Sequence, residues 1–460
     1  MKPNSCPIKF ICLWVLLSSL TIASCKKLVQ VDEPDDSLTT STVFSNDSLA
    51  QVAVNGLYIK IMTNTKFLLN GGMSLFPGLS ADELLRTSTM NNEEQFFQNA
   101  INPNNLLVNS NLWKAAYSYI YHCNICMEGL HKSTGVTAEI RKRLTGEVLF
   151  VRALCYYYLV NLYGDVPLVL GTNAEVNAML ARAASDKVYI QMESDLLAAT
   201  DALAGTNINT RPTQYAAMAL LARVYLHMQY WSRAEEMANA VITAGQFTLA
   251  NDLNAVFKTK SPETIFQWAP VTANSNSGEG FIFVPSSAAV RPNYTIDTGL
   301  LAAFEANDLR RHNWVRTVMI NGIKYDHPHK YKVFRSPVAE EYNVVLRLAE
   351  QYLIRAEARA RQLRTEEAVD DINVIRTRAG LPAIAKNISN DQCLQQLQKQ
   401  RRVELFAEWG HRWFDLKRTQ QADAILGVAK GGRWQAHDQL YPIPFTELEN
   451  APNLEQNSGY

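Results

Sequence analysis

The chain has 460 residues, and its 44 lysines and arginines balance its 44 aspartates and glutamates, so the formal net charge is zero. This balance excludes the strongly basic surface that is typical of nucleic-acid-binding proteins. Hydrophobic residues make up 47% of the chain and charged residues 19%, which is the composition of a globular protein. Aromatic residues, at 10%, are plentiful enough to fill a core or to form a surface that stacks against sugars.

The N-terminal segment has the pattern of an export signal. Lys2 and Lys9 accompany an apolar run over residues 10–23 that is too short to span a membrane. The run leads through Ile-Ala-Ser to Cys25, which is a lipobox. We therefore expect residues 1–24 to be a signal peptide that is removed and Cys25 to carry a lipid anchor. A plain secretory cleavage site is the alternative, but the cysteine just after the apolar run favours lipidation.

Residues 25–42 are polar and acidic and contain a proline, with neither helical nor strand periodicity. They predict a tether between the lipid and the fold. A helical region is expected over residues 43–245, starting with a helix at 47–62. Within it, residues 70–111 are rich in glycine and asparagine, which predicts a long irregular segment of the kind that often carries function.

Apolar residues at alternating spacings of three and four predict three further helices, because this spacing lines one face of a helix. These helices are expected at residues 113–130, 139–163 and 189–203.

Two later segments each favour a pair of helices about 34 residues long, which is the tetratricopeptide period. The pairs cover residues 212–245 and 346–380. In the first pair, Ser232 and Glu235 predict a capping box at the start of the second helix. The pairs lie far apart in sequence, so we expect one helical scaffold with an interruption.

The interruption, residues 247–343, is called the insertion. Its composition predicts loops with short strands, expected at residues 263–271 and 281–284. A hairpin is expected over residues 312–332, with an Asn-Gly turn at Asn321.

Residues 399–418, KQRRVELFAEWGHRWFDLKR, combine large aromatic residues with charged residues at high density. So many rings cannot all remain in water, and charges that enter the interior with them must pair. We therefore predict a mostly helical, half-buried structural element with internal ion pairs and a break at Gly410, in preference to a catalytic site.

This stretch resembles the ELxxExGHRWFDLxR signature of the SusD/RagB family of outer-membrane nutrient-binding lipoproteins. Gln400 stands where that family often has an acid. Further segments are similar to family motifs, namely residues 146–169, 308–311, 347–360, 441–444 and 453–460, although Ser458 stands where proline is usual.

The resemblance implies the SusD-like fold, a mainly α fold in which tetratricopeptide-like helix pairs form the scaffold and a loop-rich insertion contains short β-strands. It divides the chain into an N-terminal helical region over residues 43–245 and a C-terminal region over residues 246–460, which includes the insertion at 247–343.

The resemblance also implies a non-enzymatic, lipid-anchored protein of the outer membrane that faces the cell exterior. Such a protein binds oligosaccharides and delivers them to a partner TonB-dependent transporter of the SusC-like kind. The alternatives are a surface-anchored hydrolase, a binder of another nutrient such as peptide, and a tetratricopeptide scaffold that binds only protein. Neither a cofactor nor nucleic acid is expected.

Sugar binding needs flat aromatic faces for the C–H face of the pyranose and polar side chains for the hydroxyl groups, in a shallow exposed site. Residues 70–111 and the insertion both contain this chemistry. Binding residues vary within the family, so none is assigned by motif, while Trp113 and Trp268 are expected in the core. The ligand-binding candidates are Arg86, Phe96, Phe97, Asn99, Tyr294 and Trp314.

Motifs for phosphate binding, nucleophilic hydrolysis and zinc peptidases are absent from the sequence, so no catalytic residue is assigned. His327 and His329 could bind a metal, but without a nearby cysteine or carboxylate cluster we interpret them as part of an exposed turn and predict no metal site. Cys123 and Cys126 fall within an expected helix, where core packing is favoured over a zinc or redox motif.

Overall fold

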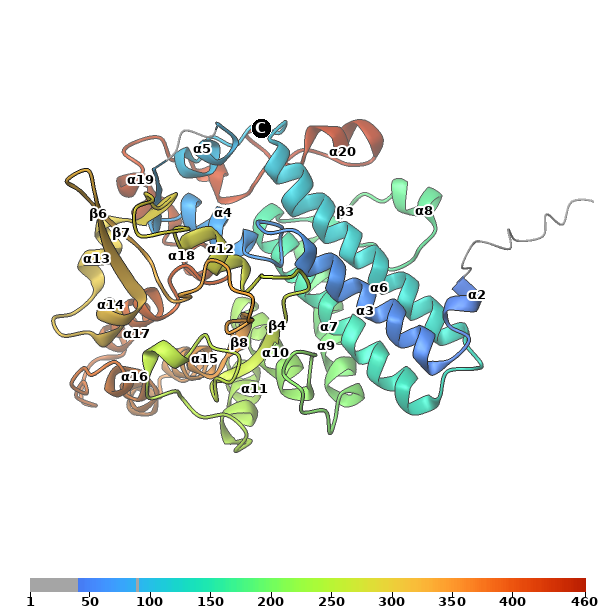
Figure 1. The fold of residues 1–460 in the computed structure, drawn as a ribbon, viewed down its shortest axis with the longest axis horizontal. Coiled ribbons are helices and arrows are strands. Elements are labelled where there is room, and N and C mark those ends of the chain that lie inside the picture. The colour runs from blue at the N-terminus through green and yellow to red at the C-terminus, as the bar shows by residue number, and fades with distance from the viewer. Residues whose placement is uncertain (1–39, 88–90) are drawn as a thin grey trace, which may run out of the picture.

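The computed structural model describes residues 40–87 and 91–460. The predicted signal peptide, Cys25 and most of the predicted tether lie outside the described residues. In the described part of the chain, helices dominate and the strands form four two-stranded antiparallel sheets. The mainly α fold class expected from the sequence is confirmed (Figure 1).

The N-terminal helices follow the predicted apolar stripes closely. The first is α3 (Asp47–Thr63), where the side-chain oxygen of Asn46 accepts a hydrogen bond from the Leu49 amide at 3.0 Å and so caps the helix. Helix α7 (Ala138–Tyr163) ends where Gly164 adopts a φ of 73°, which glycine accepts without strain. The other elements of this region are α2 (Thr40–Val43), α6 (Lys114–Lys132), β2 (Val166–Pro167), α8 (Ala174–Ala178), β3 (Arg182–Ala183) and α9 (Ser185–Ala202).

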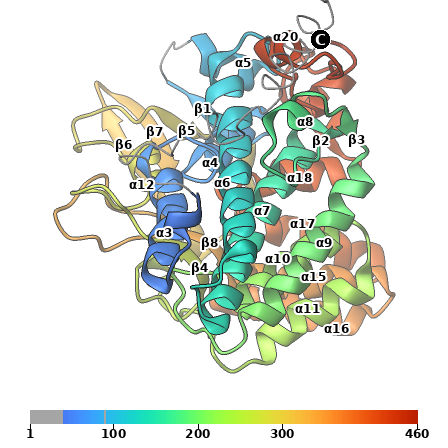
Figure 2. The ribbon, with the colours of Figure 1, turned by 90° about the vertical axis from the view of Figure 1, so that its right-hand side faces the viewer.

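Both predicted helix pairs are present. The first consists of α10 (Gln214–His227) and α11 (Trp231–Thr243), and the second of α15 (Leu348–Arg361) and α16 (Thr365–Arg378). Helix α11 packs against α15, so the two pairs form one array although the insertion separates them in sequence (Figure 2). This array continues into α9 and α7 through α10 and gives the molecule its scaffold.

Two helix starts differ from expectation. The predicted capping box of Ser232 does not form, because the N-cap of α11 is Tyr230, which makes no side-chain hydrogen bond to the helix. Glu235 pairs instead with Arg359 of α15 at 3.1 Å, so a tertiary ion pair uses the carboxylate. Helix α15 starts later than predicted because the preceding residues form strand β8 (Asn343–Arg347).

Residues 70–111 are more regular than their composition predicts. Their asparagines satisfy backbone groups: Asn105 accepts a hydrogen bond from the Leu107 amide at 2.9 Å and donates one to the carbonyl oxygen of Asn92 at 2.8 Å. The asparagine-rich composition thus reflects turns and local hydrogen bonding, which short amide side chains favour. The elements are α4 (Gly72–Ser80), β1 (Leu84–Arg86), α5 (Asn91–Gln98) and a π-helix, η3 (Leu107–Trp113).

The insertion contains the predicted hairpin. Strands β6 (Val315–Ile320) and β7 (Ile323–Pro328) pair across a turn at Asn321 and Gly322, both of which have positive φ. His327, near the end of β7, is buried, so the exposed turn expected there is wrong for this histidine.

The strand predicted at 281–284 is wrong. These residues belong mainly to helix α12 (Gly278–Phe283), because Ser277 Oγ accepts a hydrogen bond from the Gly280 amide at 3.0 Å and caps a helix at this point. The apolar run that resembles a strand is therefore one face of a short helix. The remaining insertion elements are η4 (Leu253–Ala255), β4 (Thr264–Trp268), β5 (Tyr294–Ile296), α13 (Thr298–Ala303) and α14 (Leu309–Trp314).

Sheets fasten the insertion to the scaffold at two places. Strand β4 pairs with β8, which joins the two ends of the insertion where they meet the helices. Strand β5 pairs with β1, which ties the middle of the insertion to the N-terminal region. The main hydrophobic core accordingly draws residues from both regions, while a smaller apolar cluster lies among α15, α16 and α17 (Asn390–Glu404).

The aromatic stretch at 399–418 forms the end of α17 and all of α18 (His411–Arg418), and Gly410 between them has a φ of 72°. Trp413 and Phe414 are buried, with ring centroids 5.8 Å from Trp434 and 6.0 Å from Tyr157 respectively. The burial confirms the structural interpretation. The chain ends with α19 (Ala422–Ala429), η5 (Ala436–Gln439) and α20 (Phe445–Asn450).

Apolar packing also accounts for the cysteines of the described part: Cys123, Cys126, Cys155 and Cys393 are all buried free thiols. None of the helices in residues 40–87 and 91–460 is long and apolar enough to cross a membrane.

Replacing Trp413 or Phe414 with alanine is expected to lower the free energy of unfolding by about 3–5 kcal/mol, because each ring leaves a cavity in a packed core. Denaturant unfolding of the purified protein measures the loss. Phe445→Ala is the control, since that side chain is 45% exposed. An unchanged unfolding midpoint for both core variants would contradict the structural role.

Candidate ligand-binding site

The structure buries three of the four aromatic residues predicted to contact a ligand. Phe96 and Trp314 are 0% exposed and Tyr294 is 1% exposed. A sugar cannot stack on rings that have no free face. In this structure the three side chains therefore serve as core packing. Phe97 is partly buried, with Lys430 Nζ 4.9 Å from its ring centroid, and it remains a prediction.

Each buried ring has a specific polar or aromatic partner. The Tyr294 hydroxyl donates to Glu93 Oε2 at 2.8 Å, and the Trp314 indole donates to the carbonyl oxygen of Leu253 at 2.9 Å. Phe96 stacks on Phe76 with ring centroids 4.7 Å apart. Such partners are what buried tyrosine and tryptophan rings require.

The two polar candidates are also used internally. Arg86 makes ion pairs with Glu94 at 2.7 Å and with Glu93 at 3.5 Å. Asn99 is buried and donates a hydrogen bond to the carbonyl oxygen of Ser80 at 3.1 Å. Both residues therefore fix the segment between α4 and η3.

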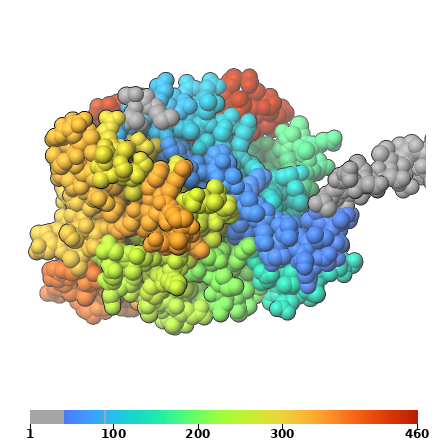
Figure 3. Space-filling model, viewed as in Figure 1, coloured from blue at the N-terminus to red at the C-terminus, as the bar shows by residue number. Residues whose placement is uncertain are grey.

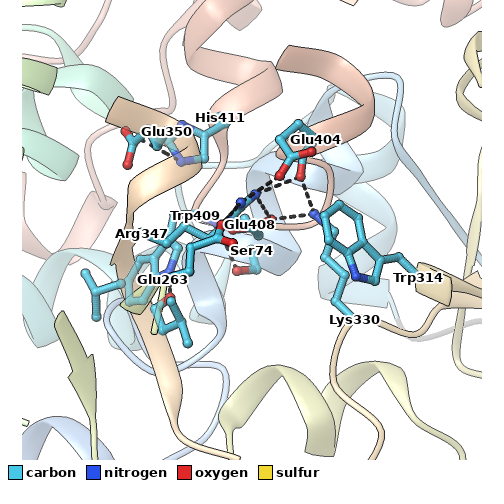
Figure 4. Close-up of polar contacts among 12 residues, drawn as sticks. Ser74, Glu263, Trp314, Lys330, Arg347, Glu350, Glu404, Glu408, Trp409 and His411 are labelled. Atoms are coloured by element: carbon cyan, nitrogen blue, oxygen red, sulfur yellow. Dashed lines mark hydrogen bonds and ion pairs between the residues drawn. The ribbon is translucent and has the colours of Figure 1, made fainter. Parts of the chain in front are cut away.

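Beside Trp314 lies a group of buried charged side chains that we call the ionic cluster, part of which is drawn in Figure 4. Arg347 is at its centre and pairs with Glu263 at 2.9 Å, with Glu404 at 2.7 Å and with Glu408 at 2.8 Å. Four cations and four carboxylates make up the cluster, so its formal charge is zero: Arg310, Lys330, Arg347, Arg378, Glu263, Asp308, Glu404 and Glu408.

The electrostatics of the cluster keep Glu404 ionised. Burial alone would raise the pKa of Glu404, but the guanidinium groups of Arg378, Arg347 and Arg310 outweigh it and hold this pKa well below its usual range. Lys330 bonds to Glu408 and to the carbonyl oxygen of Glu404, and burial lowers its pKa to about 8. A cluster with every charge paired and no access to solvent is suited to structure and not to proton transfer.

The exposed face of the insertion is hollowed where it meets the start of the N-terminal region, and Figure 3 shows its yellow and orange segments beside the blue one. We call this depression the aromatic hollow. It has a volume of about 280 Å³. Its described lining residues are Met62, Thr63, Asn64, Thr65, Phe67, Asn70, Pro270, Thr272, Ser275, Asn276, Ser277, Gly278, Phe281, Phe334 and Arg335.

A pair of half-buried rings dominates the aromatic hollow. Phe281 and Phe334 stack with centroids 5.0 Å apart and an interplanar angle of 16°. The Arg335 guanidinium lies 5.0 Å from the Phe281 centroid and 5.5 Å from the Phe334 centroid. The arrangement presents aromatic surface and a cation together at the protein surface, where a ligand can reach them.

Exposed polar side chains surround these rings. Asn64 and Thr272 are exposed, and Ser275 is half-buried. Asn276 is buried and holds the wall: its side-chain oxygen accepts hydrogen bonds from the amides of Glu340 and Glu341 at 2.8 and 2.9 Å. Side-chain amides and hydroxyls of this kind can bond to the hydroxyl groups of a ligand.

Phe281, Phe334 and Arg335 are not among the candidates that the sequence indicates. The sequence predicts a strand at Phe281, and the signal against it is the Ser277 cap, which starts a helix too short to bury all its apolar residues. Phe334 and Arg335 follow the hairpin in a segment without secondary structure, and nothing local indicates that they meet α12.

In the described residues, no group of three or more histidine, cysteine, aspartate or glutamate side chains could hold a metal ion.

Two family profiles match the chain. Residues 32–226 match the profile described as "Starch-binding associating with outer membrane", and residues 324–460 match the profile of the SusD family. The chain belongs to the SusD/RagB family. Among its relatives is the SusD-like protein P2 of Formosa agariphila, which is 24% identical over 502 residues that cover 96% of this chain and 98% of that protein.

Solved structures of SusD/RagB proteins share the fold. A SusD superfamily protein of Bacteroides vulgatus superposes with a TM-score of 0.79 at 20% identity, covering 91% of this chain and 100% of the other. The surface glycan-binding protein A of Bacteroides thetaiotaomicron superposes with a TM-score of 0.76 at 21% identity, covering the same shares. These similarities show that the chain has the same overall fold as the matched structures.

Replacing Glu404 with glutamine is expected to lower the free energy of unfolding by about 3–5 kcal/mol, because it leaves buried guanidinium groups without their carboxylate. Thermal and denaturant unfolding measure the effect. Glu449→Gln, at an exposed position of α20, is the matched control and should unfold like the unaltered protein. If the two variants have equal stability, the ionic cluster does not hold the fold as we infer.

Proposed function

We propose that the protein is a cell-surface lipoprotein that binds oligosaccharides at the aromatic hollow and delivers them to a partner TonB-dependent transporter of the outer membrane. The stacked, half-buried rings of Phe281 and Phe334, with Arg335 beside them, are the observation on which this proposal rests. Membership of a family described as starch-binding supports the ligand class.

The chemistry of the hollow suits a sugar. The C–H face of a pyranose packs on an aromatic ring. The exposed side chains of Asn64 and Thr272 line the same hollow and can form hydrogen bonds with the hydroxyl groups of the sugar. A volume of about 280 Å³ is close to the lower end of the roughly 300–1,000 Å³ that ligand pockets span, which suits one or two sugar units of a longer chain.

A binding role is favoured over hydrolysis. Most glycosidases need two carboxyl groups that flank the scissile bond. The described lining of the aromatic hollow contains no aspartate or glutamate. The carboxylates of the ionic cluster are buried and paired, so they do not supply the missing acid and base.

The location at the cell surface is supported by the lipobox at Cys25 and by the family description, which refers to association with the outer membrane. Delivery to a transporter is the role that this location and a ligand-binding hollow would serve together. Transporter contact is accordingly part of the proposal.

Replacing Phe281 or Phe334 with alanine is expected to weaken oligosaccharide binding several-fold, since a stacking contact contributes about 1 kcal/mol beyond the area it buries. Calorimetric titration against a panel of neutral oligosaccharides measures the affinity, and melting curves verify the fold. Phe445→Ala removes an exposed ring of α20 and should bind like the unaltered protein.

If both variants retain full affinity for a sugar that the unaltered protein binds, the aromatic hollow is not the site, and Phe97→Ala becomes the next variant to measure. If a peptide binds and no oligosaccharide does, the ligand class is wrong. Release of shorter sugars from a substrate by the pure protein would favour the hydrolase alternative.

Replacing Cys25 with alanine is expected to prevent membrane attachment, because acyl chains on this residue would supply the hydrophobic anchor. Fractionation of cells that express each form measures the fraction of protein in the outer membrane. Equal recovery of both forms in that fraction would show that another segment attaches the protein.

A further inference from the structure

A second depression adjoins the aromatic hollow and shares Phe334 and Arg335 with it. We call it the basic hollow; its volume is about 350 Å³. Arg316 and Lys332 also line it, while its described lining contains no aspartate or glutamate. The sign of the charge along this part of the surface is therefore positive, although the chain as a whole is neutral.

The two arginines of the basic hollow are exposed and carry no ion pair with any described residue. Arg316 projects from β6, and its side chain makes no hydrogen bond within the described part of the chain. The Arg335 guanidinium lies beside the rings of Phe281 and Phe334 and makes no hydrogen bond to a described residue. A planar guanidinium group that is free in this way can bind a carboxylate or sulfate through two parallel hydrogen bonds.

Lys332 adds an amino group in a fixed position to the lining of the hollow. Its ammonium group donates to the carbonyl oxygens of Asn313 and His329, both at 2.5 Å, so its position is set. Burial and the charge of Arg316 lower the pKa of Lys332 to about 8, against the opposing effect of nearby carboxylates. Arg316 and Lys332 both line the hollow, so an anion bound there would be attracted to both side chains.

The positive surface continues into a third depression of about 710 Å³, which shares Arg316 and Lys332 with the basic hollow. The two carboxylates that line this third depression already form ion pairs with arginines. Glu305 pairs with Arg376 at 2.5 Å, and Asp308 pairs with the buried Arg310 at 2.8 Å. Each depression thus shares lining residues with the next, and we call the three together the trough.

We propose that the trough selects oligosaccharides that carry acidic groups, with Arg316 and Arg335 binding carboxylates or sulfate esters of the sugar whose neighbouring units stack at Phe281 and Phe334. This inference rests on the proposed function. It assigns the substrate class of the same site: acidic in preference to neutral glycans.

The test compares matched ligands that differ only in charge. Purified full-length protein is titrated with oligogalacturonates and with the same oligomers after methyl esterification of their carboxyl groups. A second arm uses laminarin oligosaccharides before and after chemical sulfation, which separates recognition of sulfate from recognition of carboxylate. The variants are Arg316→Gln, Arg335→Gln, Arg316→Lys and, for the proposed function, Phe281→Ala.

The unaltered protein is expected to bind at least one charged ligand more tightly than its neutral counterpart. Each arginine-to-glutamine change should weaken that binding about threefold to tenfold, the range for partly exposed charge-assisted hydrogen bonds. Arg316 lies outside the lining of the aromatic hollow, so Arg316→Gln should leave the binding of neutral oligosaccharides unchanged. Arg316→Lys should weaken the binding less than Arg316→Gln does, because lysine keeps the positive charge but cannot form the two parallel hydrogen bonds of a guanidinium group. Raising the salt concentration should reduce the preference.

The control variant is Lys142→Gln, which removes one positive charge from an exposed position of α7, away from the lining of all three depressions. It should bind every ligand like the unaltered protein. If Lys142→Gln and Arg316→Gln lose the same affinity, the effect comes from the net charge of the protein, and the proposed role of Arg316 is wrong.

Two further outcomes separate this inference from the proposed function. If neutral and charged forms bind equally and Phe281→Ala weakens both, the sugar site stands and the preference for acidic groups is wrong. If none of these oligosaccharides binds, both the sugar site and its charge preference are overturned.

Discussion

The rest of the structure depends on one electrostatic constraint: the buried charges of the ionic cluster must neutralise one another. Glu404 and Glu408 come from the aromatic stretch, Arg347 from the end of β8, Arg378 from α16 and Lys330 from the insertion. Since an unpaired charge in an interior is very costly, all of these segments have to meet at the same point. The cluster thereby fixes the insertion on the helical scaffold, and it explains why charged residues accompany the aromatic residues of this family's signature.

That constraint also positions the trough. Lys330, held by Glu408, lies two residues before Lys332, and the Tyr331 hydroxyl between them bonds to the Val344 amide at 3.0 Å. The segment that continues to Arg335 therefore starts from an immobilised point and reaches the surface within a few residues. Burial at one end and exposure at the other give the short segment two roles: its first side chains stabilise the fold, and its last ones are available at the surface for the ligand contact that we propose.

Much of the fold could be predicted because helical periodicity is local, as the match between the expected helix at 139–163 and α7 illustrates. The pairing of charges in the aromatic stretch was also foreseeable from the cost of burial. The partners of these charges could not be predicted. Glu263 and Arg347, for example, are distant in sequence and come together because strands β4 and β8 pair. The residues of the proposed site could not be predicted for the same reason. Residue type makes Trp314 a candidate for stacking against a sugar, whereas tertiary packing buries its ring and leaves Phe281 half-buried at the surface.

The pairing of β4 with β8 has a consequence for how such proteins diversify. Because this ladder closes the insertion at its base, the entropy of loop closure depends only weakly on the length of chain beyond it. The stretches 271–291 and 333–342 lie beyond that closure and include none of the cluster's charges, so their residues can be exchanged, lengthened or shortened with little effect on the helical scaffold. In a scaffold built in this way, substitutions in two short surface stretches can change the ligand that is bound while the interior stays the same.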